Sequence, residues 1–225
     1  MLDAMIISKL RKYSTPCISD ALDTLGVNGG LEGLLPIRRG MKVLGPVFSV
    51  IFEPVASGCD APAADYLDEV PAGSVLLLAN SGITYCTVWG SILTRIAKMK
   101  GIEGTVIDGC CRDIHTINEI DYPIFSKSIY MKSARNRVRK IDQQKQVKIG
   151  NILINPEDIV CGDDSGVIVV PSNLVEVVVD LCVQIESVEE KIMTDVNHGV
   201  TLQNAKKRHG YNHFSFKDCV LNTYD

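Results

Sequence analysis

The sequence predicts one compact α/β domain over residues 1–225. Apolar runs of strand length alternate with amphipathic helix patterns from about residue 42 to residue 129, and this βαβα order favours a sheet with some parallel pairing. Hydrophobic residues make up 46% of the 225 residues and charged residues 22%, which is ordinary for a chain that buries a sizeable core. The sequence shows no repeat, low-complexity tract or linker that would divide it.

Two helices are expected near the N-terminus, and the first covers Leu2–Lys12. In the second helix, Thr15 is the predicted N-cap, Pro16 occupies the first helical position, and Gly26 ends the helix. The apolar face of this second helix consists of Ile18, Ala21, Leu22 and Leu25. A glycine-rich connection, Gly29–Gly33, follows it.

Strands and helices alternate in the middle of the chain. The predicted strands are Lys42–Phe52, Ser74–Ala79, Gly104–Asp108 and Pro123–Ser126. The predicted helices are Ala64–Glu69, Val88–Lys100 and Asp113–Ile120. The helix over Val88–Lys100 would end at Gly101. Its apolar face would consist of Trp89, Ile92, Leu93, Ile96 and Ala97.

The last third of the chain begins with a polar and basic stretch. Lys132–Lys145 is expected to be a solvated loop, with an RNA or acidic partner as the alternative. Short strands are predicted over Val147–Ile154, Asp158–Val160 and Gly166–Val170. A long amphipathic helix over Asn173–Asn197 follows, and its apolar positions are Leu174, Val178, Leu181, Ile185, Val188 and Ile192. A final short helix, capped by Thr201, would end near His209.

Charge and cysteine content narrow the class of protein. Lys and Arg number 23 against 27 Asp and Glu, so the net charge is −4 and binding to nucleic acid through its phosphates is not expected. The chain has no signal peptide pattern and no apolar run of membrane length, which favours a cytoplasmic protein. Its eight cysteines lack zinc-site spacing and are expected to be free thiols in a reducing compartment. They are Cys17, Cys59, Cys86, Cys110, Cys111, Cys161, Cys182 and Cys219.

The most informative chemical pattern is the stretch Gly104–Asp113. A buried strand ends in Asp-Gly, and Arg112 and Asp113 follow at the start of a helix. Ligands gather at the carboxyl ends of strands in open α/β sheets. Asp113 is a suitable oxygen ligand for Mg²⁺ or Mn²⁺, and Arg112 can pair with a carboxylate or an enolate oxygen. The alternative is that Asp113 only caps the helix while Arg112 forms a surface ion pair.

A second pattern runs from Ser81-Gly82 to Trp89–Leu93. It leads from a strand into a helix whose free N–H groups could hold a carboxylate. The alternative is an ordinary strand–helix junction with a core tryptophan. Cys110 and Cys111 have no histidine placed to activate them, so they are expected to be buried thiols, and His115 is expected at the surface.

Three stretches together resemble the RraA-like superfamily. They are TPCISDALDTLG, WGSILTRIAKMKGIEGTVIDGCCRD and VKIGNILINPEDIVCGDDSGVIVVP. This superfamily includes class II 4-hydroxy-4-methyl-2-oxoglutarate/4-carboxy-4-hydroxy-2-oxoadipate aldolases, oxaloacetate decarboxylases and the RNase E regulator. The match covers about residues 15–211 and leaves a C-terminal tail, 212–225. The resemblance implies a fold like the swivelling β/β/α fold, assembled as a homotrimer or hexamer with the active site between subunits.

The resemblance also implies roles for particular residues. Asp113 would bind the divalent metal, Mg²⁺ or Mn²⁺, and Arg112 would polarise the keto oxygen and stabilise the pyruvate enolate. The loop at Gly90, Ile92 and Leu93 would give N–H groups to the substrate carboxylate. Glu190 of a neighbouring subunit would complete the outer metal shell, with Glu186 as the alternative.

One position departs from the pattern of the superfamily. The catalytic members carry an acidic residue where this chain has Ser91. A serine hydroxyl can hydrogen-bond a water but is a poor base, and general acid–base catalysis typically contributes about 10²- to 10⁴-fold in rate. Nearby acidic residues that could substitute for it are Asp60, Asp65, Asp68 and Glu103.

Two functions are therefore predicted as alternatives. The first is a divalent-metal-dependent carbon–carbon lyase on a small 2-oxo acid, by retro-aldol cleavage or oxaloacetate decarboxylation. The second is a non-catalytic binding protein of the RNase E regulator type, whose partner is an RNA-degradation enzyme and whose main support is Ser91. A different reaction on a related acid is a third possibility.

Overall fold

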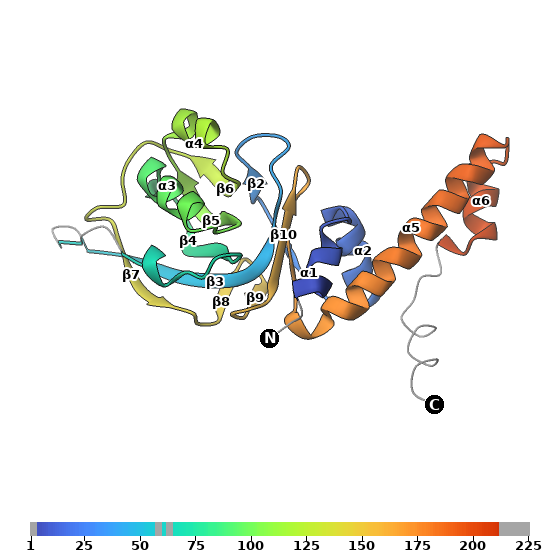
Figure 1. Cartoon of the computed structure of the whole chain (residues 1–225), viewed down its shortest axis with the longest axis horizontal. Helices are drawn as coiled ribbons and strands as arrows, with labels where there is room; N and C mark the ends of the chain where they lie inside the picture. Colours follow the sequence, from blue (N-terminus) through green and yellow to red (C-terminus); the bar gives the residue numbers. More distant parts are fainter. Residues whose placement is uncertain (1–3, 57–59, 62–64, 212–225) are drawn as a thin grey trace.

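A large mixed sheet organises the protein in a computed structural model that describes residues 4–56, 60–61 and 65–211 (Figure 1). Its centre consists of four parallel strands, β3 (Val43–Pro54), β4 (Val75–Trp89), β5 (Gly104–Cys111) and β6 (Ile124–Ile129). Antiparallel strands flank this centre: β2 (Leu35–Pro36) pairs with β6, and β7 (Val138–Gln143) and β10 (Ile159–Asp163) pair with β3. The sheet continues from β10 through β11 (Gly166–Val170) to β1 (Gly30–Leu31). This arrangement confirms the predicted α/β class.

Helices and a small hairpin bury the sheet on several sides. Helices α3 (Ser91–Met99) and α4 (Ile114–Ile120) and the short 3₁₀ helix η1 (Leu67–Glu69) pack over a core that includes Leu78, Ile107 and Trp89. The hairpin β8 (Val147–Ile149) and β9 (Ile152–Ile154) contributes to a second core. Helices α1 (Ala4–Leu10), α2 (Thr15–Thr24) and α5 (Val175–Asn197) form a third core against β10 and β11. The apolar periodicity of the predicted helices therefore matches buried faces in α2 and α5.

The start of α2 differs by one residue from the prediction. Ser14 is the N-cap, and its side chain accepts a hydrogen bond from the N–H of Cys17. Thr15 cannot serve as the cap because its hydroxyl and its N–H both donate to the Asp163 carboxylate, at 2.6 and 2.8 Å. Gly26 follows the C-cap with a φ of +69°, a left-handed conformation that glycine adopts without strain, so the predicted end of the helix is confirmed.

The predicted helix over Val88–Lys100 is wrong at its start. Val88 and Trp89 are the last residues of β4, and α3 begins only at Ser91. Strand β4 is longer than the predicted Ser74–Ala79 because pairing with β5 resumes after an irregular segment at Ser81 and Gly82, where φ is positive. Trp89 therefore reaches the core from the strand. Ile92, which was expected on the buried face of the helix, is 73% exposed.

The basic stretch Lys132–Lys145 is not simply a loop, because it contains strand β7. This strand lies beside β3 with an irregular register near Ile51. Its side chains are mostly polar and partly exposed, which is typical of a strand outside the buried centre of a sheet. The sequence missed it because polar edge strands lack an apolar repeat. The short strands β1 and β2 were missed too.

Helices α5 and α6 (Leu202–Arg208) form an arm that extends away from the sheet in Figure 1. The first half of α5 packs on α2, whereas its far end contacts α6. The side chain of Thr201 accepts from the N–H of Asn204, so the predicted N-cap of α6 is confirmed.

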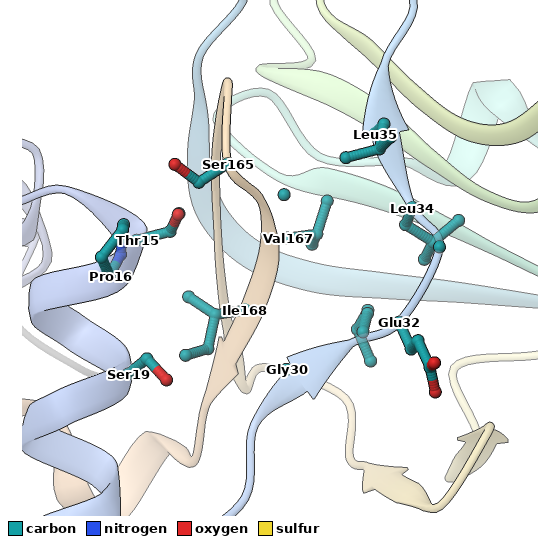
Figure 2. A pocket seen from close by; sticks show the side chains of 13 residues that line it. Thr15, Pro16, Ser19, Gly30, Glu32, Leu34, Leu35, Ser165, Val167 and Ile168 are labelled. Atoms are coloured by element: carbon teal, nitrogen blue, oxygen red, sulfur yellow. The ribbon is translucent and has the colours of Figure 1, made fainter.

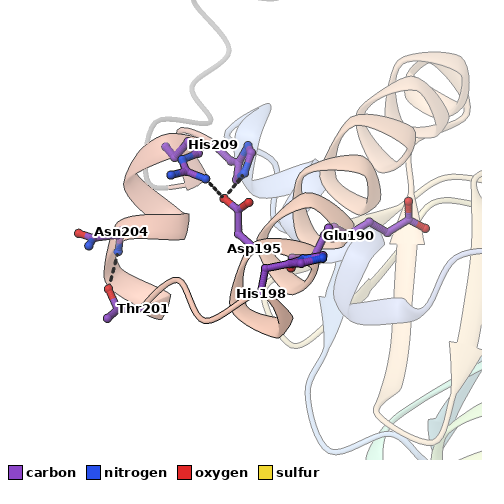
Figure 3. A network of polar contacts seen from close by, with 8 residues as sticks. Glu190, Asp195, His198, Thr201, Asn204 and His209 are labelled. Carbon is purple, nitrogen blue, oxygen red and sulfur yellow. Dashed lines mark hydrogen bonds and ion pairs between the residues drawn. The ribbon is translucent and has the colours of Figure 1, made fainter.

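Asp195 in α5 joins the two helices of the arm. Its carboxylate accepts hydrogen bonds from Arg208 and His209 of the α6 end, each at 2.9 Å (Figure 3). The bond from His209, together with the charge of Arg208, holds the pKa of Asp195 below its usual value. The position of α6 on the arm is thus set by polar contacts as well as packing.

Some predicted features lie outside the described residues. These are the first residues of the predicted N-terminal helix, Ala64 at the start of the predicted helix Ala64–Glu69, and the C-terminal tail 212–225. The predicted helix Ala64–Glu69 is too long, because Asp65 and Tyr66 are not helical and only η1 remains of it. Among the helices in the described ranges, none combines the length and apolar character that crossing a membrane requires.

Candidate functional site

Arg112 and Asp113 lie where β5 ends, beside the junction between β4 and α3. The two junctions are neighbours because β4 and β5 run parallel and pair Trp89 with Cys111 at their carboxyl ends. The N–H of Ser91 donates to Oδ2 of Asp113 at 2.9 Å. Arg112 Nε is 3.8 Å from the same oxygen. The structure thus brings together the two patterns that the sequence analysis treated separately.

Asp113 is held in an unusual conformation. Its φ of +64° lies in the left-handed region, which Asp tolerates better than most residues but which still strains the backbone. It is the N-cap residue of α4 by position, but its side chain makes no capping hydrogen bond to that helix. The other half of the alternative, a surface ion pair of Arg112, agrees with the contact to Asp113, in which both side chains are partly exposed. The Asp113 side chain is 38% exposed, and its Oδ1 has no partner among the described residues. One carboxylate oxygen is therefore available to a ligand.

Gly90 allows this close approach. A Cβ at position 90 would lie 2.8 Å from Oδ2 of Asp113 and 3.3 Å from Nε of Arg112. Because the backbone at Gly90 is extended, with a φ of −163°, the need for glycine comes from space and not from conformation. No larger residue fits without moving the carboxylate.

The first turn of α3 presents free hydrogen-bond donors. Gly90 is the N-cap of α3 and has no side chain to cap it, and Ser91 N–H is already bonded to Asp113. Within the described part of the chain, the N–H groups of Ile92 and Leu93 have no partner, because the first helical bond runs from Thr94 to Gly90. With the half-exposed Arg112 guanidinium beside them, these groups can hold an anion.

The predicted residues of the arm are not part of this arrangement within one chain. Glu186 and Glu190 lie on α5, and the distal part of the arm that carries Glu190 is on the far side of the sheet from α3 and α4 (Figures 1 and 3). In the described ranges, no group of three or more His, Cys, Asp or Glu side chains is placed to share a metal ion. Any contribution of Glu190 to a metal would have to come from another copy.

Asp108, in the same strand as the motif, has a different role. Its side chain is 4% exposed, and it forms an ion pair with Lys127 of β6 at 2.6 Å. It also accepts the N–H of Gly82 at 2.9 Å. Asp108 thereby fixes the irregular segment of β4, which gives the Ser81-Gly82 pattern a structural explanation.

A hollow with a volume of about 370 Å³ lies elsewhere (Figure 2). It is bounded by the start of α2, the glycine-rich segment before β2 and the turn between β10 and β11, and its polar lining includes Ser19, Glu32 and Ser165. None of the predicted site residues lines it. In the sequence, the only sign of it is the Gly29–Gly33 connection.

The described cysteines are free and buried. Burial raises the pKa of Cys111 to about 11, so its thiolate is scarce at neutral pH. Cys59 and Cys219 lie outside the described residues. His115 pairs with Glu119 and is 90% exposed. The expectation of buried thiols at Cys110 and Cys111 and a surface histidine at 115 is confirmed.

Comparison with protein families identifies the family to which this fold belongs. The RraA-like family model, described as Aldolase/RraA, matches residues 15–169, which is more than half of the chain. The chain therefore belongs to the RraA-like family, as the resemblance predicted.

Two curated relatives show what this family contains. Protein DlpA of Legionella pneumophila is 39% identical over 208 residues, which cover 92% of this chain but only 34% of DlpA, so the chain spans about a third of that relative. A Halalkalibacterium halodurans protein provisionally named 4-hydroxy-4-methyl-2-oxoglutarate aldolase is 30% identical over 166 residues, covering 73% of this chain and 76% of that protein.

Two solved structures share the fold. An uncharacterised protein from Pseudomonas syringae superposes with a TM-score of 0.83 at 39% identity, covering 91% of this chain and 98% of that one. Streptomyces coelicolor RraAS2, described as an unusual member of the RNase ES inhibitor RraA protein family, superposes with a TM-score of 0.76 at 29% identity. That match covers 84% of this chain and 95% of RraAS2.

Proposed function

We propose that this protein is a divalent-metal-dependent carbon–carbon lyase that acts on a small 2-oxo acid. The observation that supports it most is the Asp113 carboxylate, which is held by the Ser91 N–H and keeps one free oxygen beside Arg112 and the free N–H groups of α3. Relatives with the provisional name of 4-hydroxy-4-methyl-2-oxoglutarate aldolase support the same reaction class.

The donor set fits Mg²⁺ or Mn²⁺ better than zinc. Mg²⁺ is usually held by one or two carboxylates, with water and substrate oxygens completing its shell. Asp113 supplies one exposed carboxylate oxygen, and the part of the chain that the structure describes contains no group of three or more His, Cys, Asp or Glu side chains of the kind that a zinc site needs. A divalent cation at Asp113 would draw electron density from the keto oxygen of the substrate.

The protein's own groups account for substrate binding. The N–H groups of Ile92 and Leu93, at the start of α3 beside Gly90, would hold the substrate carboxylate. Arg112 would donate to the keto oxygen and remain bonded to it as negative charge develops there. These contacts orient the bond that breaks. It joins the carbon next to the keto group to the following carbon.

One cleavage scheme covers both candidate reactions. The electron pair of the broken bond stays on the carbon next to the keto group and forms pyruvate enolate, while carbon dioxide or a carbonyl fragment leaves. The enolate then takes a proton from water to give pyruvate. Retro-aldol cleavage also requires removal of a hydroxyl proton. Ser91 can orient a water for that step but is a poor base, and a missing base typically costs about 10²- to 10⁴-fold in rate.

Assembly is part of the proposal. The arm carries Glu190 away from the Asp113 of its own chain, so a homotrimer or hexamer in which the arm reaches a neighbouring site would supply the outer-shell glutamate. A cytoplasmic location fits the predicted free thiols.

The direct test is pyruvate release from oxaloacetate and from 4-hydroxy-4-methyl-2-oxoglutarate. Chelator-stripped protein would be assayed with and without Mg²⁺ or Mn²⁺, against metal-only blanks because free metal also decarboxylates oxaloacetate. Metal-dependent release above the blank that disappears in Asp113→Asn is expected. Release that is equal in wild type and Asp113→Asn would remove Asp113 from the site.

The second candidate is a non-catalytic regulatory protein, and the observation that favours it is the neutral residue at position 91. The likeness to Streptomyces coelicolor RraAS2 is consistent with it. Ser91→Asp separates the two functions. A gain in pyruvate release would mean that the site is catalytic and limited by the missing acid. Absence of turnover in both forms, with retention of an RNA-degradation enzyme on the immobilised protein, would favour regulation.

A further inference from the structure

We infer that Trp89 and Thr94 are positioning residues that set the distance between the first turn of α3 and the Arg112–Asp113 pair. This inference rests on the proposed function, because it assigns a purpose to the geometry of that site. Neither side chain contributes a group to the Asp113 carboxylate or to the free N–H groups. Their effect would come through the main chain of Gly90.

A buried chain of hydrogen bonds holds the carbonyl of Gly90. The indole Nε1–H of Trp89 donates to the Thr94 hydroxyl at 2.8 Å. That hydroxyl donates to the carbonyl of Gly90 at 3.0 Å, and the N–H of Thr94 donates to the same carbonyl at 3.1 Å. Both side chains are almost fully buried, so water does not compete for these bonds. The indole therefore fixes the hydroxyl, and the hydroxyl fixes Gly90.

The main chain of Trp89 holds the other half of the site. Its carbonyl accepts the N–H of Arg112 at 3.2 Å and the hydroxyl of Thr87 at 2.9 Å. One residue thus bonds to the α3 turn through its side chain and to the Arg112 segment through its backbone. Gly90 and Ser91, which contact Asp113, lie directly after it in the sequence. A shift of the α3 turn relative to Trp89 would move the Ser91 N–H away from the Asp113 carboxylate.

Packing alone does not explain the choice of these two residues. Trp89 stacks on Tyr122, with ring centroids 6.3 Å apart and planes 14° from parallel, and a phenylalanine, although smaller, could keep an aromatic ring in that place. Thr94 is fully buried in a helix, where valine has the same shape. What distinguishes Trp and Thr from these apolar replacements is the hydrogen bond between them. That bond is directed at the turn that forms the site.

Thr94→Val and Thr94→Ser test this role. Valine keeps the volume and removes the hydroxyl, whereas serine keeps the hydroxyl. Trp89 is the only tryptophan, so its fluorescence reports on the bond. Its emission should shift to shorter wavelength in Thr94→Val and remain close to wild type in Thr94→Ser.

The second measurement is the binding of oxalate, a mimic of pyruvate enolate. Calorimetry measures its dissociation constant in the presence of Mn²⁺. Residues that orient a metal site from outside typically change metal affinity or activity by about 10- to 100-fold when mutated. We therefore expect the dissociation constant for oxalate to rise at least tenfold in Thr94→Val and to be restored to within about threefold of wild type in Thr94→Ser.

Thr105→Val is the matched control. It removes a buried threonine hydroxyl that contacts the Tyr122 hydroxyl at 3.0 Å in the same core, but this pair makes no contact with Gly90. It should lower the urea midpoint and leave oxalate affinity unchanged. If Thr94→Val binds oxalate as tightly as wild type, Thr94 is only structural and the inference is wrong.

Two further results keep the test decisive. If Thr94→Val does not fold, Trp89→Phe removes the indole N–H while keeping the stacked ring, and unchanged oxalate binding in that variant would overturn the inference. If wild type binds neither Mn²⁺ nor oxalate, the proposed function fails and the inference fails with it. Wild-type binding that is unaffected by Thr94→Val and Trp89→Phe would overturn the positioning role alone.

Discussion

Two aspartates in this protein each hold the start of a helix that lies elsewhere in the sequence, and they do so in different ways. Asp163, at the end of β10, receives the N–H and the hydroxyl of Thr15 at the start of α2. It also receives the N–H of Ser165 at 2.8 Å. Burial raises the pKa of Asp163, but these three hydrogen bonds and the positive charge of Lys42 together outweigh it and keep the pKa below its usual value. Both of its oxygens are occupied.

Asp113 receives only the Ser91 N–H at the start of α3, and its other oxygen has no partner in the described part of the chain. Its backbone is left-handed, whereas Asp163 is part of a regular strand. The difference separates a structural carboxylate from one suited to bind a ligand: the first has its hydrogen-bonding capacity filled by the protein, and the second keeps capacity open at a strained position.

The largest expected effect is on turnover, from Asp113→Asn compared with Asp163→Asn. Asparagine tolerates the left-handed backbone and still accepts the Ser91 N–H, so Asp113→Asn should fold normally. It removes the charge that would hold the metal, and we expect metal-dependent pyruvate release to fall by at least about 10²-fold, equivalent to about 2.7 kcal/mol. Asp163→Asn should retain turnover. Equal losses in both variants would mean that the two carboxylates do not differ in function.

Gly90→Ala tests the position of the Asp113 carboxylate, because it displaces that carboxylate without replacing the residue. The new Cβ would lie 2.8 Å from Oδ2, which is too close, so the carboxylate must shift. We expect turnover to fall by about tenfold, equivalent to about 1.4 kcal/mol, with little change in the urea midpoint. Gly33→Ala is not a suitable control because φ is positive there. Gly30→Ala, where a Cβ meets only a side-chain atom at 3.8 Å, is the matched control and should be silent.

Asp163→Asn should act on stability instead. It removes the charge from two hydrogen bonds that fasten Thr15 of α2 to the end of β10 and from a third, from the N–H of Ser165, that lies within the β10–β11 turn. A hydrogen bond contributes about 1 kcal/mol net, and we expect a loss of that order in the free energy of unfolding. Urea denaturation measures it. An unchanged midpoint would show that the core between α2 and α5 positions the helix without this contact.

The smallest effect is on acid sensitivity. Because the folded-state pKa of Asp163 is lowered, its contribution to stability is present above the unfolded-state value, about 3.9, and is lost as the pH falls through the folded-state pKa. Between pH 5 and pH 3, the urea midpoint of wild type should therefore fall further than that of Asp163→Asn. Parallel curves for the two proteins would mean that this carboxylate does not titrate differently on folding.

The comparison also indicates which parts of the site were predictable. Arg112 and Asp113 were found because a buried strand followed by polar residues marks the carboxyl end of a sheet. The strand-to-helix pattern at Trp89–Leu93 already indicates free N–H groups that could hold a carboxylate, and the family resemblance adds that this carboxylate belongs to the substrate. The contact between Ser91 and Asp113 was not predicted, because it depends on the register between β4 and β5, and that register is irregular.

Errors in the fold have a similar origin. The spacing of Trp89 from Leu93 and Ala97 matches a helical period and predicts a helix there, yet pairing with β5 keeps Trp89 in a strand. Strand β7 was missed because its polar side chains carry no apolar repeat. The Asp163 contact with Thr15 joins residues 148 positions apart, and the local sequence around either residue does not predict it.

The sequence by itself determined the α/β class, the long helix α5 and the placement of Arg112 and Asp113 at the end of a buried strand. These features follow from local periodicity and from residue types at strand and helix ends. Only the tertiary structure decided which carboxylate is filled by hydrogen bonds and which keeps an oxygen free, and that Trp89 and Thr94 hold Gly90 beside Asp113. The reason is physical: hydrogen-bond saturation and close approach depend on how distant segments pair, and pairing register is a property of the folded sheet.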